Sequence, residues 1–148
     1  MRPNKISYYI GIAEAVAKRS TCLRRQYGAV IVKDDRIIST GYNGAARGEP
    51  NCCDEGECWR EAHDIPHGQQ YEKCRAVHAE VNAIINANPS DMIGATLFLA
   101  GFENGKPINI PHPCEMCWRM ITNAQIKEVI TGVSNIRLNE IKVMNEMG

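Results

Sequence analysis

The chain has 148 residues, a length that fits one domain able to bury a sizeable apolar core. Lysine and arginine together number 17, as do aspartate and glutamate, so no net charge draws the chain to a polynucleotide or an anionic membrane. Its partner is therefore expected to be a small molecule. No apolar run is long enough to span a bilayer and residues 1–20 show no signal-peptide pattern, so we expect a cytoplasmic protein.

The first half of the chain predicts a helix, a hairpin and a long polar segment. Residues 6–20 place apolar side chains at helical spacing. Residues 27–32 and 36–42 read as two strands joined by a polar turn at Asp34 and Asp35. Residues 45–74 are rich in cysteine, glycine and charged side chains, which predicts a pinned loop with a short helix. A helical pattern then runs from residue 76 and ends before Pro89, where a helix cannot easily continue.

The second half alternates strands and helices. Residues 95–102 form an apolar run of strand length, and residues 108–112 lead irregularly to a helix over 114–123, for which Pro113 suits the start. Residues 126–132 predict another strand. Residues 136–147 have helical spacing, with a strand as the alternative. This order predicts an α/β fold, a mixed sheet covered by helices, in one domain over residues 1–148.

Cysteine usage indicates a metal. The chain contains seven cysteines, a high and odd number. In a secreted chain of this size they would suggest a disulfide framework. Without a signal peptide, ligation of zinc by thiolates is the better interpretation.

Two short motifs carry the residues that indicate chemistry. "HAEVNAI" begins at His78 and has Glu80 two positions later, and "PCEMC" contains Cys114 and Cys117. A zinc ion that activates water needs three protein ligands and one open position. The two cysteines share one face at the start of a helix, where the helix dipole favours thiolates. We therefore expect His78, Cys114 and Cys117 to hold a catalytic zinc.

Glu80 has a different expected role, because a fourth protein ligand would close the metal site. As a general acid and base it takes a proton from water and returns it to a ring nitrogen and then to the leaving amine. Alone, His-x-Glu fits a helix cap, and Cys-x-x-Cys fits a redox pair or half of a structural zinc site. Together and in this order, they match the signature of zinc nucleobase deaminases.

The sequence resembles the cytidine and deoxycytidylate deaminase family, and within it the deoxycytidylate (dCMP) deaminases. The segments "CLRRQYGAVIVKDDRIISTGYNG", "CRAVHAEVNAI" and "PCEMCWRMITNAQIKEVI" carry the resemblance, which covers nearly the whole chain. It implies a cytidine deaminase-like three-layer fold with a central mixed five-stranded sheet flanked by helices. It also implies zinc-dependent hydrolysis of dCMP to dUMP and ammonia, which supplies dUMP for thymidylate synthesis.

The resemblance further implies a second, structural zinc in a cysteine-rich insert at about residues 45–75. Related dCMP deaminases build this site from a cysteine before the first hairpin, one after the GYNG motif, and cysteine or histidine ligands upstream of the His-Ala-Glu motif. The matching residues here are Cys22, Cys52 or Cys53, Cys58 and Cys74. The offset from Gly44 favours Cys52, and His63 and His67 are reserve ligands. Such a site would order a polar segment that cannot bury enough apolar surface by itself.

The motif "TGYNG" adds a substrate-site residue by resemblance, Asn43. A turn is the alternative reading and is compatible with it, since asparagine and glycine tolerate positive φ. No motif reveals phosphate recognition, for which the undecided candidates are Arg24, Arg25, Arg47 and Lys106. Two departures could alter substrate choice: Val81, where many relatives carry a polar residue, and the longer stretch "GFENGKPINIPH".

The resemblance also implies a homo-oligomer, often a hexamer in the family, and regulation as in many members, with dCTP as activator and dTTP as inhibitor. The sequence leaves open whether Mg²⁺ assists effector binding. The alternatives are a zinc deaminase acting on another base (cytidine, cytosine, tRNA adenosine, or a pterin or riboflavin precursor) and a non-catalytic zinc-stabilised nucleotide-binding module. Balanced charge argues against a tRNA substrate. The presence of Glu80 argues against the binding module, because a structural zinc does not need it.

Overall fold

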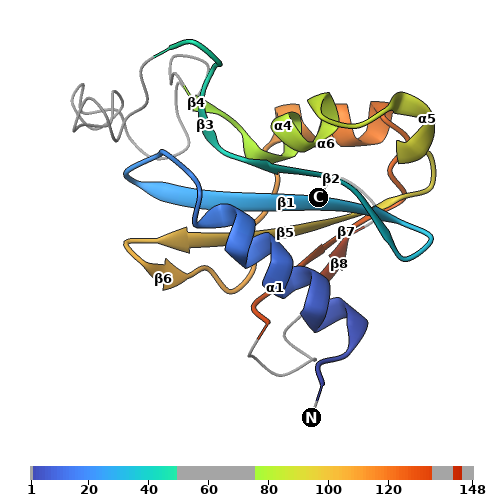
Figure 1. The fold of residues 1–148 in the computed structure, drawn as a ribbon, viewed down its shortest axis with the longest axis horizontal. Coiled ribbons are helices and arrows are strands. Elements are labelled where there is room, and N and C mark those ends of the chain that lie inside the picture. The colour runs from blue at the N-terminus through green and yellow to red at the C-terminus, as the bar shows by residue number, and fades with distance from the viewer. Residues whose placement is uncertain (1, 50–75, 135–141, 145–148) are drawn as a thin grey trace.

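The structure, a computed structural model, describes residues 2–49, 76–134 and 142–144 (Figure 1). The helices in this part of the chain are α1 (Lys5–Ala17), α4 (Ala79–Ile85), α5 (Pro89–Met92) and α6 (Glu115–Asn123). The strands are β1 (Arg25–Lys33), β2 (Arg36–Tyr42), β3 (Gly44–Ala45), β4 (Ala76–Val77), β5 (Thr96–Glu103), β6 (Lys106–Pro107), β7 (Glu128–Thr131) and β8 (Lys142–Met144). Among these helices, none is both long and apolar enough to cross a membrane.

The main sheet is mixed, as the sequence predicts. Its strand order is β2-β1-β5-β7-β8, and the short β6 pairs with β5 outside this path. β5 and β7 run parallel, and the other pairs in this sheet are antiparallel. A parallel pair needs a crossover, and α6 lies in the connection between β5 and β7. The five strands on the path confirm the expected sheet.

The sheet separates two helical layers, because neighbouring residues of a strand face opposite sides. On β1, Val30 and Val32 pack with α1, whereas Ala29 and Ile31 pack with the buried faces of α4 and α6. Figure 1 shows α1 on one side of the sheet and α4, α5 and α6 on the other. The residues expected to carry the chemistry belong to the side of α4 and α6.

Two glycines let helices approach the sheet at backbone distance. A Cβ on Gly28 would lie 2.1 Å from the Ala13 carbonyl oxygen of α1. A Cβ on Gly41 would lie 2.5 Å from the Ala79 carbonyl oxygen and 2.3 Å from the Ala83 amide nitrogen of α4. Each face of the sheet therefore has one glycine at which the backbone of a helix comes into direct contact with a strand.

The structure corrects two sequence predictions and adds one short helix. Ala76 and Val77 form strand β4, paired with β3, so the helix begins only at Ala79. α4 ends at Ile85, before Pro89 as predicted, and Pro89 begins the separate short helix α5 at a position where its missing N–H is not needed. Residues 142–144 form strand β8, in agreement with the strand alternative rather than the predicted helix. The rest of 136–147 lies outside the described residues. The helix of α1 and the β1–β2 hairpin are confirmed.

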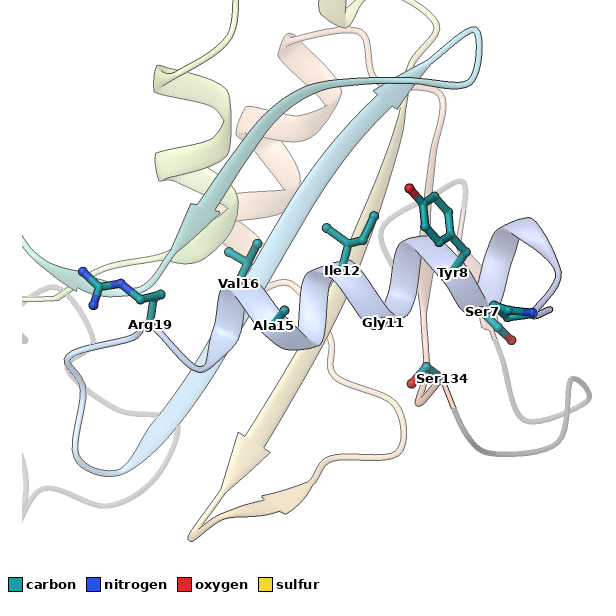
Figure 2. Close-up of a pocket in the computed structure, with 9 residues that line it drawn as sticks. Ser7, Tyr8, Gly11, Ile12, Ala15, Val16, Arg19 and Ser134 are labelled. Carbon is teal, nitrogen blue, oxygen red and sulfur yellow. The ribbon is translucent and has the colours of Figure 1, made fainter. Parts of the chain in front are cut away.

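A shallow groove of about 650 Å³ runs along the outer surface of α1 (Figure 2). Its lining includes Tyr8, Ile12, Val16, Arg19 and Ser134 and is mainly apolar. Because α1 covers the opposite face of the sheet from α4 and α6, this groove is separate from the expected catalytic residues.

The β1–β2 turn is tied to α1 by a carboxylate. Asp34 and Asp35 both have positive φ, 52° and 61°, as a two-residue hairpin turn of the favoured twist requires. Lys5 Nζ donates to Asp35 over 2.6 Å, and the Tyr9 hydroxyl donates to the other carboxylate oxygen over 2.5 Å. These bonds, that from Lys5 first, lower the pKa of Asp35 from its ordinary value of 3.8. The hydrogen bond between Tyr9 and Asp35 raises the pKa of Tyr9 to about 12.

This lowered pKa predicts a pH-dependent contribution to stability. A group with a depressed folded-state pKa stabilises above its unfolded pKa, and the effect is lost as pH falls through the folded pKa. We expect the Tm of the wild type to fall faster than that of Asp35→Asn below about pH 4. Thermal unfolding at stepped pH measures the two slopes, in which any pH-independent effect of asparagine in the turn cancels. Parallel slopes would contradict the assignment.

Candidate metal centre and active site

His78 is placed by a short strand pair and begins a helix. Gly44 of β3 pairs with Val77 of β4 in antiparallel register, which brings together the chain segments of Asn43 and His78, the residues that adjoin this pair. His78 is the N-cap of α4 with extended backbone, and its side chain makes no capping hydrogen bond. The imidazole is thus directed away from its own helix, toward α6.

The two cysteines come from the first turn of α6. Cys114 is the N-cap, and its sulfur accepts from the backbone amide of Cys117 at 3.4 Å. Cys117 is fully buried, whereas Cys114 is half-buried. The capping geometry directs both sulfurs toward His78, whose Nδ1 lies 3.2 Å from the Cys117 sulfur and 3.5 Å from the Cys114 sulfur.

This donor set fits zinc. The ligand atoms of His78, Cys114 and Cys117 lie within 4.8 Å of one another, and no other group of this kind occurs within residues 2–49, 76–134 and 142–144. With ordinary Zn–N and Zn–S bond lengths, tetrahedral geometry separates a nitrogen from a sulfur by roughly 3.6 Å. The observed separations of 3.2 and 3.5 Å are close to this value. Three protein ligands leave a fourth position open, as a catalytic zinc requires.

The electrostatics of the metal-free cluster favour a thiolate. The Cys117 thiol donates to the Cys114 sulfur, and this bond, with a contribution from His78, lowers the pKa of Cys114 to about 4. The same shared proton, with burial, raises the pKa of Cys117. The Cys114 thiolate in turn raises the pKa of His78. A cation placed among these three atoms would replace the shared proton and favour the second thiolate as well.

Glu80 lies beside the cluster and is almost completely buried. Its exposed fraction is 5%, which is unusual for a carboxylate in the first turn of a helix. Burial raises its pKa, and the neighbouring His78 opposes this shift in part. A carboxyl group with a raised pKa beside a metal centre can both accept and return a proton near neutral pH.

Asn43 is buried and holds the start of β1. Its side-chain oxygen accepts from the Tyr27 amide and its side-chain nitrogen donates to the Arg25 carbonyl, both at 2.8 Å. The Ser20 hydroxyl donates to the Asn43 carbonyl, also at 2.8 Å. Asn43 is thus fixed to β1, while the β3–β4 pair brings its chain segment together with that of His78.

The remaining predicted residues are distributed differently. Cys22 is half-buried, and its amide donates to the Ser20 hydroxyl over 3.2 Å, next to the Asn43 segment. Arg25 is paired with Glu103 at 2.8 Å, and Arg47 donates to Asn86 at 3.2 Å. The other predicted second-zinc residues lie outside the described part of the chain: Cys52, Cys53, Cys58, Cys74, His63 and His67.

Sequence reasoning missed the contacts that fasten α4 to β2. The Ser39 hydroxyl donates to the Ala83 carbonyl at 2.7 Å, and Asn82 and Asn86 also bond to the backbone of β2. The available signal was Gly41, because glycine inside a strand often marks a close backbone approach.

Comparisons with known proteins agree with this site. A family model described as the cytidine and deoxycytidylate deaminase zinc-binding region matches residues 3–133. The deoxycytidylate deaminase of Mycobacterium phage D29 is 38% identical, covering 87% of this chain and 94% of the relative. That of Schizosaccharomyces pombe is 37% identical over 87% of this chain but only 37% of its own length.

Solved structures share the fold. The crystal structure of dCMP deaminase from the cyanophage S-TIM5 in complex with dCMP and dUMP is 26% identical, with a TM-score of 0.60, over 88% of this chain and 82% of that chain. Cytidine deaminase from Burkholderia pseudomallei, 16% identical with a TM-score of 0.57, shares the fold over 92% of this chain and 88% of its own. With the family model covering most of its length, this chain belongs to the cytidine and deoxycytidylate deaminase family.

Proposed function

We propose that this protein is a zinc-dependent hydrolase that converts dCMP and water to dUMP and ammonia. The observation that carries the proposal is the buried carboxylate of Glu80 beside the His78, Cys114 and Cys117 donor set. A structural zinc site needs no acid at that position. The names of the relatives support dCMP as substrate, since the phage relative of nearly equal length is a deoxycytidylate deaminase.

The residues of the chain divide the work between them. His78, Cys114 and Cys117 would hold Zn²⁺, which supplies a Lewis acid that makes water acidic enough to act as a nucleophile near neutral pH. Glu80 takes a proton from the attacking water and delivers it to the ring nitrogen, and it then carries the second proton, from the newly added hydroxyl group, to the departing amine. Its burial excludes bulk water from the proton it carries. Asn43, which the family motif assigns to the nucleotide site, would border the bound nucleotide, with its side chain held by the backbone of β1.

A substrate panel tests the proposal. Zinc-loaded protein is given dCMP, dCTP, cytidine, cytosine and a short tRNA hairpin separately, and ammonia and products are measured by chromatography. Conversion of dCMP to dUMP alone is the expected result. Turnover of another substrate would move the chain to a sister activity in the family, and silence on all five with zinc present would favour a nucleotide-binding module.

We also propose a second, structural zinc that includes Cys22. Cys22 is half-buried, and its backbone amide donates to the Ser20 hydroxyl, which in turn donates to the Asn43 carbonyl, so a metal on Cys22 would tie the 45–75 insert to this segment. The remaining ligands would come from that insert. Metal binding would then contribute directly to folding.

Zinc content tests both metal sites together. We expect about two zinc ions per wild-type chain and about one in each of Cys22→Ser and Cys117→Ser, measured by elemental analysis. Cys22→Ser should keep most dCMP turnover but lose thermal stability, whereas Cys117→Ser should lose turnover. About one zinc ion in the wild type, unchanged in Cys22→Ser, would rule out the second site.

We also propose that this protein is regulated and assembled as other members of the family are. Activation by dCTP with Mg²⁺, inhibition by dTTP and a homo-oligomeric state can be measured in the same preparation, by adding each nucleotide to the dCMP assay and by light scattering. Turnover that is hyperbolic in dCMP and insensitive to both nucleotides would remove regulation from the proposal without touching the chemistry.

A further inference from the structure

The helix that carries Glu80 is fastened to strand β2 by two asparagine side chains. Asn82 Nδ2 donates to the Tyr42 carbonyl over 2.8 Å, and Asn86 Nδ2 donates to the Thr40 carbonyl over 2.9 Å. Asn82 and Asn86 are four residues apart, about one helical turn, and their acceptors Tyr42 and Thr40 are two residues apart on β2. α4 has seven residues, too few to be stable alone, so such contacts and its packing on the sheet determine where it lies (Figure 1).

The two bonds differ in what they connect. Asn82 follows Glu80 by two residues and is half-buried, and its partner Tyr42 directly precedes Asn43. Asn86 is the C-cap of α4, is exposed, and also accepts from Arg47. Of the two bonds, only that of Asn82 therefore joins the helix turn that carries Glu80 to the segment proposed to border the substrate.

That segment has independent attachments to the rest of the fold. Asn43 bonds to the backbone of β1 at two points through its side chain and accepts from Ser20 through its carbonyl. Loss of the Asn82 bond would leave these contacts in place. What it would remove is the direct side-chain link between this segment and α4, so that the β3–β4 pairing at the helix start would carry the connection alone.

We propose that Asn82 is a positioning residue for the deamination, acting through its bond to the Tyr42 carbonyl to set the distance between Glu80 and the bound nucleotide. The inference rests on the proposed function. Displacement of a catalytic group by about 1 Å can lower the rate about 100-fold. The expected signature is a loss of kcat with little change in KM, because the attachments of the substrate segment remain.

Matched variants test this role in the zinc-loaded full chain. Asn82→Asp keeps the shape of the side chain but removes the hydrogen-bond donor. Asn82→Ala removes the donor and the rest of the side chain beyond Cβ. Asn86→Asp removes the equivalent donor at the far end of the same helix. We expect kcat for dCMP to fall about 10- to 100-fold in both Asn82 variants, with KM within about threefold and zinc content unchanged. Asn86→Asp should keep kcat within about threefold of the wild type.

Amide hydrogen exchange gives a readout independent of turnover. The amides of Asn43 and Gly44 should exchange faster in Asn82→Ala than in the wild type and at the wild-type rate in Asn86→Asp. Equal kcat in wild type and Asn82→Asp, or a loss in Asn86→Asp as large as in Asn82→Asp, would overturn the proposal. A wild type that does not turn over dCMP would refute the proposed function instead, and unchanged exchange in Asn82→Ala would then overturn the positioning role as well.

Discussion

Glu80→Gln is expected to abolish turnover while leaving the fold and the metal site intact. Glutamine has nearly the same shape as glutamate but cannot accept and return a proton, and general acid–base catalysis contributes about 10²- to 10⁴-fold. Glu80 is the sole buried carboxylate among the described residues, which makes it the one group positioned for this role. We expect kcat for dCMP to fall about 1,000-fold or more, with KM changed far less. Steady-state ammonia release measures both constants.

The control for this variant lies in the other helix of the site. Glu115 occupies the first turn of α6 next to Cys114 but is exposed, so Glu115→Gln changes the same charge near the same cluster without removing a buried carboxyl group. It should retain turnover within about threefold. Zinc content should match the wild type in both variants. Retained activity in Glu80→Gln would exclude Glu80 as the proton carrier. Equal losses in the two variants would show that charge near the metal, and not proton transfer by Glu80, sets the rate.

Gly41→Ala is expected to cause the largest structural damage of any single methyl group added on the site face. The new Cβ would meet the backbone of α4 at 2.3 Å, and backbone cannot rotate away as a flexible side chain can. Overpacking of this kind costs about 1–3 kcal/mol, and contact with backbone at two points favours the upper end. Because α4 must move, Glu80 and His78 move with it. We expect a lower Tm together with a loss of kcat of about 100-fold.

Gly28→Ala is the control that separates the loss of stability from the loss of activity. Its Cβ would meet the backbone of α1 at 2.1 Å on the opposite face, so it should lower Tm to a similar degree. α1 carries none of the predicted catalytic residues, and the folded protein should therefore keep kcat within about threefold. Urea unfolding and kinetics below the unfolding transition measure stability and activity separately. A Gly28→Ala variant as inactive as Gly41→Ala would mean that activity follows global stability alone.

The parts of the fold that sequence could predict are those with local repetition. The α1 helix and the β1–β2 hairpin follow from spacing and from two aspartates that tolerate positive φ at the turn. β3 and β4 could not be predicted, because two residues hold too little pattern. Val77 fits helical spacing with Val81, yet pairing with the distant Gly44 places it in a strand. Pairing between residues distant in the sequence therefore outweighed the helical spacing at Val77.

The candidate site divides in the same way. His78, Cys114 and Cys117 could be grouped from the sequence because two motifs hold zinc ligands at fixed spacing, and the structure brings them together. The burial of Glu80 was not readable, since it depends on how α4 packs against α6 and the sheet. The role of Asn82 depends on a partner 40 residues away, which no single-sequence pattern reveals.

Strand β2 lies at the edge of the main sheet, and such edges are templates for unwanted pairing between molecules. In this protein the Thr40 and Tyr42 carbonyls are already occupied by side chains of α4. The helix that carries the chemistry therefore occupies two acceptors that a strand of another molecule would need in order to pair with β2. Of the two asparagines, Asn86 would serve only to occupy this edge, whereas Asn82 would both occupy the edge and position Glu80.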